Sequence, residues 1–113
     1  MRISTDLQNV LSETQSGLSN IFGDSLDSLL LYGSYARGEQ TEESDIDIMA
    51  LVNMSKGELA QYRRRVSDFT SALDLEYGVL LSVKLQDTET FKQYATTLPF
   101  FKNVVREGIS IVQ

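Results

Sequence analysis

Two acidic residues stand inside an apolar segment in the middle of the chain, and they restrict what this segment can be. The segment from Asp45 to Val52 reads DIDIMALV. On a β-strand, residues i and i+2 share a face and lie roughly 7 Å apart, so the isoleucines would point into a core while Asp45 and Asp47 point away from it. Two partly buried carboxylates on one face repel, and at least one pKa should rise unless a cation lies between them. The pattern therefore predicts a strand whose acids face a divalent metal.

Taken alone, this pair of aspartates is also compatible with a solvated edge strand that turns both acids outward. The apolar run that follows Asp47 favours a central strand instead. The chain has no cysteine and no histidine, which excludes thiolate and imidazole ligands. A metal would have to be held by oxygen atoms, which favours Mg²⁺, Mn²⁺ or Ca²⁺.

A second signal precedes the aspartates, where Gly33-Ser34 follows an apolar strand and leads into Tyr35-Ala36-Arg37. Glycine permits close approach of the backbone to a ligand. Ser34 would stand at a helix N-terminus, where free N–H groups favour a phosphate, and Arg37 would lie on the same side. The dipeptide alone favours an ordinary strand-to-helix turn with serine as the N-cap. Together with Asp45 and Asp47 it predicts a site for a metal–triphosphate complex and nucleotidyl transfer.

The remaining pattern predicts the order of the elements. We expect strands over residues 28–32, 45–52, 79–85 and 109–112. A first helix is expected over residues 7–21 with Ser4 or Thr5 as its N-cap, and a second from a capping box at Ser55 and Glu58 through Leu73. Short helices are expected after Asp87 and over 99–106, the last closed by Gly108. This order predicts a mixed α/β (α+β) fold with a small central sheet flanked by helices. The whole chain, residues 1–113, is expected to form one domain.

Charge and hydropathy restrict the partners. The net charge is −6, and residues 1–53 carry nine acids against two bases. Such a chain is a poor candidate for general nucleic-acid binding. No signal peptide and no apolar run long enough to span a membrane are visible, so a cytoplasmic location without membrane contact is expected.

Two further motifs point to a partner protein. The run Arg63-Arg64-Arg65 could be read as a nucleic-acid patch, but a solvated helix face or contact with an acidic partner is the favoured interpretation. Phe100-Phe101 belongs either to the core or to an interface, and beside a short terminal strand it is a plausible partner-binding spot.

The run GSYARGEQTEESDIDI, from Gly33 to Ile48, closely resembles the signature of the polymerase-beta-like nucleotidyltransferase superfamily. The small size and the ending FFKNVVREGISIV resemble the minimal nucleotidyltransferases, which are usually encoded beside a HEPN-domain partner. Several members of that group act as antitoxins that transfer AMP from ATP to a tyrosine of the HEPN ribonuclease toxin. The resemblance implies the nucleotidyltransferase fold and the same activity toward a HEPN-domain partner. A homo-oligomer and a hetero-oligomer are both possible, and the sequence does not decide the oligomeric state.

Carried over residue by residue, the resemblance implies that Gly33 and Ser34 bind the phosphates of the nucleotide. Asp45 and Asp47 would be the catalytic residues that hold Mg²⁺ or Mn²⁺. Arg37 would either contact a phosphate or pair with an acid and so hold the loop.

One departure from the family concerns a third carboxylate, which the superfamily usually places on the strand after the next helix. Here Ser82 takes the polar central position of that strand, and the flanking Glu76 and Asp87 are roughly 16–20 Å away along an extended chain. Two hypotheses follow. The protein is an active nucleotidyltransferase with two metal-binding acids, or it is a catalytically degenerate domain that neutralises its partner by binding alone.

Overall fold

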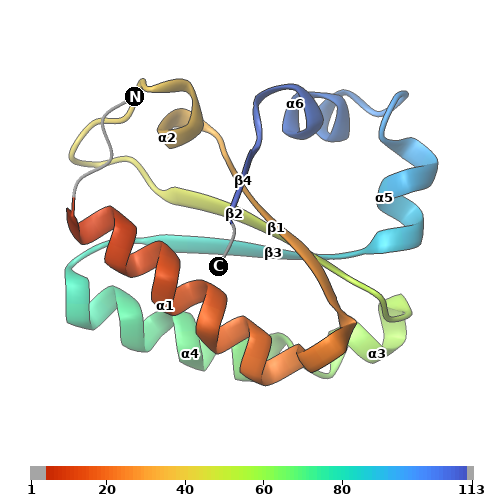
Figure 1. Ribbon diagram of the computed structural model, residues 1–113, viewed down its shortest axis with the longest axis horizontal. Coiled ribbons are helices and arrows are strands. Elements are labelled where there is room, and N and C mark those ends of the chain that lie inside the picture. Colours follow the sequence, from red (N-terminus) through yellow and green to blue (C-terminus); the bar gives the residue numbers. More distant parts are fainter. Residues whose placement is uncertain (1–4, 112–113) are drawn as a thin grey trace.

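The computed structural model describes residues 5–111 and shows a four-stranded sheet between two layers of helices (Figure 1). The strands are β1 (Leu26–Tyr32), β2 (Ile46–Val52), β3 (Leu81–Asp87) and β4 (Ile109–Ser110). The helices are α1 (Thr5–Phe22), α2 (Ser34–Arg37), α3 (Lys56–Ala60), α4 (Arg63–Tyr77), α5 (Thr88–Tyr94) and α6 (Pro99–Glu107), and a 3₁₀ turn covers Gly23–Ser25. This arrangement confirms the predicted fold class.

The strand order in the sheet is β3-β2-β1-β4. β1 pairs antiparallel with β2 and with β4, whereas β2 and β3 are parallel. The register places Tyr32, Asp47 and Ser82 side by side in one row across three strands. Because paired residues share a face of the sheet, these three side chains lie on the same face.

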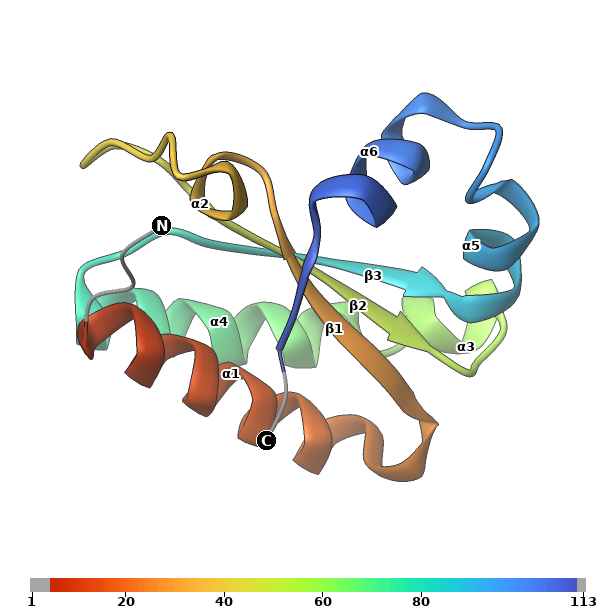
Figure 2. The same cartoon turned by 45° about the horizontal axis from the view of Figure 1, so that its top comes forward.

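The two faces of the sheet have different roles (Figure 2). Ile46, Ile48, Ala50 and Val52 of β2 point to the layer that contains α1 and α4, and they form most of the core with apolar residues of those helices. Met49 and Leu51 point to the opposite face, where a smaller cluster with Phe91, Phe101 and Val104 packs under α5 and α6. Asp47 also lies on this second face, beyond the end of the smaller cluster. The alternation along β2 thus separates the core from the acidic site.

Several predicted boundaries are wrong. β1 begins at Leu26, two residues before the predicted start, β2 begins one residue later than predicted, β3 ends at Asp87, and β4 ends at Ser110. The strand predicted over 79–85 begins two residues later, because the main-chain oxygen of Asp74 accepts hydrogen bonds from Gly78 and Val79 and its carboxylate accepts one from the Leu81 N–H. The helix predicted from the capping box through Leu73 is two helices. Tyr62 N–H bonds to the oxygen of Leu59, three residues back, and this tighter turn separates α3 from α4.

The capping box itself is confirmed, since the Ser55 hydroxyl accepts from Glu58 N–H and the Glu58 carboxylate accepts from Ser55 N–H. Asp87 caps α5 as predicted, accepting from Thr90 N–H at 2.9 Å. Gly108 follows the end of α6, but its φ of −64° is not left-handed. A side chain at Gly108 would overlap the main-chain oxygen of Val104, so close packing is the reason for glycine there. The predicted cap Ser4, the Thr5 side chain and the predicted strand end Val112 lie outside what is described.

No helix within residues 5–111 combines the length and the apolar composition that crossing a bilayer requires.

The contact between α1 and α4 depends on a glycine that the periodicity did not single out. A Cβ at Gly17 would overlap the ring of Phe69, whereas a Cβ at Gly57 in α3 would meet no atom within 4 Å. We expect Gly17→Ala to destabilise the protein by about 1–3 kcal/mol through overpacking, despite the helix propensity of alanine. Gly57→Ala is the matched control and should be neutral or stabilising by up to about 1 kcal/mol. Urea unfolding of both variants tests this, and equal effects would contradict it.

Candidate functional site

The candidate site lies where the end of β1 meets the beginnings of β2 and β3. Asp47 is the second residue of β2 and is half-buried, and Asp45 directly precedes the strand and is exposed. Tyr32, the last residue of β1, pairs with Asp47 on one side, and Ser82 of β3 pairs with it on the other. The structure thus brings the two predicted acids to the end of β1, from which the Gly33-Ser34 turn starts.

Gly33 and Asp47 are in direct contact. Gly33 has φ 76° and ψ −155°, a combination that residues other than glycine rarely adopt. A Cβ built at Gly33 would overlap the Asp47 carboxylate oxygen Oδ2. Glycine is therefore required twice over, by the backbone conformation and by the carboxylate beside it. The expected N-cap role of Ser34 is wrong, because Gly33 is the N-cap and Ser34 is the first residue of α2. The Ser34 hydroxyl makes no hydrogen bond within residues 5–111.

The charge on Asp47 is disfavoured by its surroundings. Burial is the main cause that raises the pKa of Asp47, and the negative charge of Asp45 raises it further. The positive charges of Lys84 and Arg37 act in the opposite direction but do not cancel these effects. The expectation from the sequence, that one pKa of the aspartate pair should rise, is confirmed. A cation near Asp47 would relieve this unfavourable charge.

The residues present fit a divalent cation. The donors are carboxylate oxygens, which suit Mg²⁺ or Mn²⁺, and Asp47 carries the unfavourable charge that a cation would offset. Within the described chain no group of three or more acidic, histidine or cysteine side chains is arranged to hold a metal ion. Asp45 and Asp47 would thus be the protein ligands, and solvent or the nucleotide would complete the coordination.

Ser82 is the residue of β3 that pairs with Asp47. The register thus places a neutral side chain beside Asp47, and that Ser82 stands where the superfamily has its third acid stays a prediction. Lys84, two residues further along β3, is on the same face and its ammonium lies 5.8 Å from the centre of the Phe100 ring. Residues near Asp47 on this strand are therefore neutral or basic rather than acidic.

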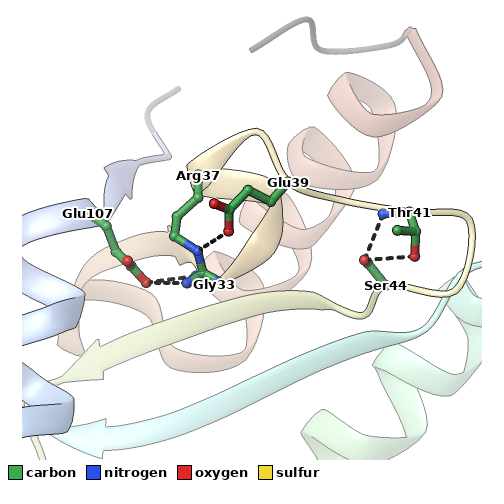
Figure 3. A network of polar contacts seen from close by, with 6 residues as sticks. All are labelled: Gly33, Arg37, Glu39, Thr41, Ser44 and Glu107. Carbon is green, nitrogen blue, oxygen red and sulfur yellow. Dashed lines mark hydrogen bonds and ion pairs between the residues drawn. The ribbon is translucent and has the colours of Figure 1, made fainter.

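Arg37 pairs with acids, which was one of the two predicted roles (Figure 3). Its Nε lies 2.8 Å from Oε1 of Glu39, and its Nη1 lies 3.1 Å from Oε1 of Glu107. The same Glu107 oxygen accepts a hydrogen bond from the Gly33 N–H at 3.3 Å. Glu107, at the end of α6, thus joins the C-terminal helix to both ends of the Gly33–Arg37 turn.

The loop before the acids is also held by hydrogen bonds. The Ser44 hydroxyl accepts from Thr41 N–H at 2.8 Å (Figure 3). Ser44 N–H donates to the Thr41 main-chain oxygen at 3.1 Å. This pair of bonds fixes the approach of the chain to Asp45. The serine in the SDID motif therefore has a local structural role.

Sequence reasoning missed two residues of this region. Glu107 lies 74 positions after Gly33 in the sequence. The one sequence signal for Glu107 as a site residue is the terminal EG, which resembles the ending of the family. Tyr32 is buried, and burial followed by the charge of Asp47 raises its pKa to about 12. Its ring meets Phe100 edge-on with centroids 5.6 Å apart, so Tyr32 supports the wall of the site beside Asp47.

The contact between Glu107 and the turn can be tested by truncation. We expect Glu107→Ala to lower the free energy of unfolding by about 1 kcal/mol and to weaken ATP binding several-fold, because Gly33 N–H and Arg37 lose their acceptor. Glu107→Gln keeps an acceptor and should lie between wild type and alanine. Glu89→Ala, at an exposed position of α5, is the control. Calorimetry with a non-hydrolysable ATP analogue measures the effect, and unchanged affinity in Glu107→Ala would contradict it.

The raised pKa of Asp47 predicts a pH-dependent stability difference. Because its surroundings disfavour the charge, ionised Asp47 lowers the free energy of unfolding. Without divalent metal, the Asp47→Asn variant should therefore melt roughly 1–3 °C above wild type at neutral pH. The difference should shrink as the pH falls through the raised pKa of Asp47 toward the ordinary value of 3.8, where the wild-type carboxyl becomes neutral too. Thermal melting over this range in EDTA measures it. A variant that melts below wild type at neutral pH would refute the assignment.

The sheet order, the glycine turn and the two acids beside it define a nucleotidyltransferase fold. The chain matches the family model described as "Polymerase beta, Nucleotidyltransferase" over residues 17–113. The chain therefore belongs to the polymerase beta nucleotidyltransferase family.

Relatives of known name agree with this membership. The chain is 32% identical over 101 residues to a Methanocaldococcus jannaschii protein named "Putative protein adenylyltransferase MJ0604", covering 89% of this chain and 93% of that one. It is 32% identical over 77 residues to "Putative protein adenylyltransferase MJ0141" of the same organism, covering 68% and 76%.

Solved structures share the fold. "Structure of putative minimal nucleotidyltransferase" superposes with a TM-score of 0.55 at 24% identity, covering 93% of this chain and 95% of the other. "Crystal structure of the toxin-antitoxin with AMP-PNP" superposes with a TM-score of 0.56 at 21% identity, covering 93% and 72%. At these identities the likeness is one of fold.

Proposed function

We propose that this protein is a Mg²⁺-dependent nucleotidyltransferase that transfers AMP from ATP to a tyrosine hydroxyl of a HEPN-domain toxin and thereby acts as the antitoxin. The observation that carries the proposal is the contact between Asp47 and Gly33, which places a destabilised carboxylate against the Gly-Ser turn. An acid beside a phosphate-binding turn is suited to a metal–triphosphate complex and has no purpose in packing.

Each residue has a defined task in this proposal. Gly33 and Ser34 bind the phosphates, since the glycine has no side chain in the way and the Ser34 hydroxyl is free to donate. Asp45 and Asp47 hold Mg²⁺, which when bound neutralises phosphate charge. Arg37 is engaged with Glu39 and Glu107, so its task is to hold the turn rather than to bind the nucleotide.

The transfer exchanges one phosphate ester bond for another. The tyrosine oxygen bonds to the α-phosphorus of ATP, the bond from that phosphorus to the bridging oxygen breaks, and pyrophosphate leaves with the electron pair. The phenol proton is released to solvent. A phenol ionises with a pKa near 10, so it depends less on a general base than an alcohol does, which suits a site with Ser82 beside Asp47.

The comparisons support the proposal in two respects. The relatives from Methanocaldococcus jannaschii carry names that specify AMP transfer to protein. The toxin-antitoxin structure of the same fold was obtained with AMP-PNP, an ATP analogue.

A second candidate function is neutralisation of the toxin by binding alone. Serine in place of the third acid favours it, as does the lack of a group of three ligating side chains within residues 5–111. In that case Asp45→Asn combined with Asp47→Asn would still neutralise the partner.

The deciding experiment incubates the protein with labelled ATP, Mg²⁺ and the HEPN protein encoded beside it. Incorporation of AMP is measured by mass spectrometry of the partner. We expect label on a tyrosine, none in EDTA, and none when that tyrosine is replaced by phenylalanine. Neutralisation of the toxin without any incorporation of AMP would exclude the proposed activity and support the binding-only alternative.

A further inference from the structure

A groove of about 630 Å³ follows β3 along the outer edge of the sheet. Its walls include Arg63, Ser67 and Thr70 of α4 on one face and Phe100 of α6 on the other, and its base is β3 itself. β3 is the terminal strand of the sheet, so within residues 5–111 no other strand pairs with this edge. At Ser82 the groove reaches the residue that pairs with Asp47.

The main chain of β3 offers hydrogen-bonding groups to this groove. The main-chain oxygen of Leu80 accepts from Ile46 N–H, so it points toward β2. Main-chain groups of consecutive residues point to opposite sides of a strand, so the N–H and C=O groups of Val83 and Leu85 point away from β2. Leu81 N–H also points outward, and Asp74 accepts its hydrogen bond. The part of the edge at Val83 and Leu85 is therefore able to pair with an added strand.

The groove is basic in an acidic protein. Arg63 and Lys84 line it and no acidic residue does, although the chain holds 16 acids and 10 bases. Neither Arg63 nor Lys84 forms an ion pair within the described residues. A second copy of the chain at the same edge would bring two basic grooves together. The charge therefore favours an acidic segment of a different protein.

We propose that this groove is the docking site for an extended acidic segment of the protein substrate, which pairs with β3 and carries the acceptor tyrosine. The proposal rests on the proposed function and specifies how the acceptor is held. A residue paired beside Ser82 would continue the row from Asp47, about two strand spacings or ~10 Å away, with its side chain on the same face.

This geometry selects for tyrosine. The tyrosine ring is long enough to cross the short Ser82 side chain toward Asp47, whereas the hydroxyl of a serine would remain near its own strand. A neighbour two positions from the tyrosine would lie beside Lys84, so an acidic residue there would find a cation. Serine at the position of the third acid thus leaves room for the incoming ring.

Peptide binding tests the docking site without relying on catalysis. The probe is a short fluorescein-labelled peptide of alternating valine and glutamate with one tyrosine, and the matched probe has lysine in place of glutamate. By fluorescence anisotropy we expect the glutamate peptide to bind at least about tenfold more tightly at low salt. Equal binding of the two peptides would overturn the proposal.

Two variants test the two proposed sources of peptide affinity, which are main-chain hydrogen bonds to β3 and the positive charge of the groove. Val83→Pro removes an outward N–H at an edge position where proline is tolerated, and should weaken peptide binding about fivefold for the lost hydrogen bond. Arg63→Glu should weaken it about tenfold or more. Arg65→Glu makes the same charge change on an exposed residue of α4 outside the groove, and should leave binding within about twofold. Thermal melting checks the fold of each variant, and Arg63→Glu remains decisive if Val83→Pro does not fold.

The AMP-transfer assay separates this proposal from the proposed function. If AMP transfer to the HEPN protein is unchanged in Arg63→Glu relative to Arg65→Glu, the docking site is refuted and the nucleotidyltransferase stands. If the glutamate peptide binds with the predicted dependence on Arg63 but no AMP is ever transferred, the docking site stands and the enzymatic function falls.

Discussion

Asp47→Asn is expected to reduce AMP transfer by about a thousandfold or more while the fold is retained, the largest effect of any single substitution. Asparagine keeps the shape of the side chain but removes the charge that would hold Mg²⁺ next to the Gly33-Ser34 turn in the proposed mechanism. Loss of a charged group that stabilises the transition state can cost about 4 kcal/mol, which corresponds to a factor of roughly a thousand. Single-turnover transfer of labelled AMP to the HEPN protein measures the effect.

The matched control for this substitution is Asp27→Asn. Asp27 is an exposed acid near the start of β1, and the sheet register places that end of the strand beside Val52, away from the site. It should retain wild-type activity. Asp47→Asn should in addition no longer be stabilised against heat by Mg²⁺, whereas Asp27→Asn should respond like wild type. Retention of more than a tenth of the wild-type rate in Asp47→Asn would remove Asp47 from the catalytic assignment.

Gly33→Ala is the second substitution with a large expected effect, because it acts on the backbone and on the acid at once. Alanine at φ 76° and ψ −155° carries a strain of about 1–3 kcal/mol, and its methyl group would displace the Asp47 carboxylate. We expect a lower melting temperature and a loss of AMP transfer of about a hundredfold, since small misplacements of reacting groups have effects of this size.

Gly23→Ala distinguishes the two components of this effect. Gly23 also has a positive φ, 58°, but a Cβ there would meet nothing within 4 Å. It should lower stability without changing AMP transfer. Equal activity of Gly33→Ala and Gly23→Ala, measured below both melting temperatures, would mean that the contact between Gly33 and Asp47 has no part in catalysis.

Parts of the fold could be predicted because they depend on local pattern. The alternation in DIDIMALV identifies a strand with Ile46 and Ile48 toward the core, and both are buried in the structure. The capping box and the helix ends follow from hydrogen bonds between near neighbours. The errors have two causes. Asp74 accepts hydrogen bonds from residues four to seven positions later, so β3 begins later than the apolar pattern predicts. The Tyr62 ring packs 5.0 Å from that of Phe22, a tertiary contact at the turn that divides one expected helix into two.

The features of the candidate site also fall into two groups, those that the sequence predicts and those that only the tertiary structure shows. The sequence alone determined that Gly33, Ser34, Asp45 and Asp47 belong to one motif, since its members are close along the chain and the two acids are separated by one residue. Only the tertiary structure decided that Glu107 holds the turn, that Asp47 lies against Gly33 and carries a raised pKa, and that β3 leaves a basic edge open. These features depend on which distant segments of the chain pack together, and on how far that packing excludes water from their side chains. Periodicity along the chain records which face is buried, and it does not record which residues meet there.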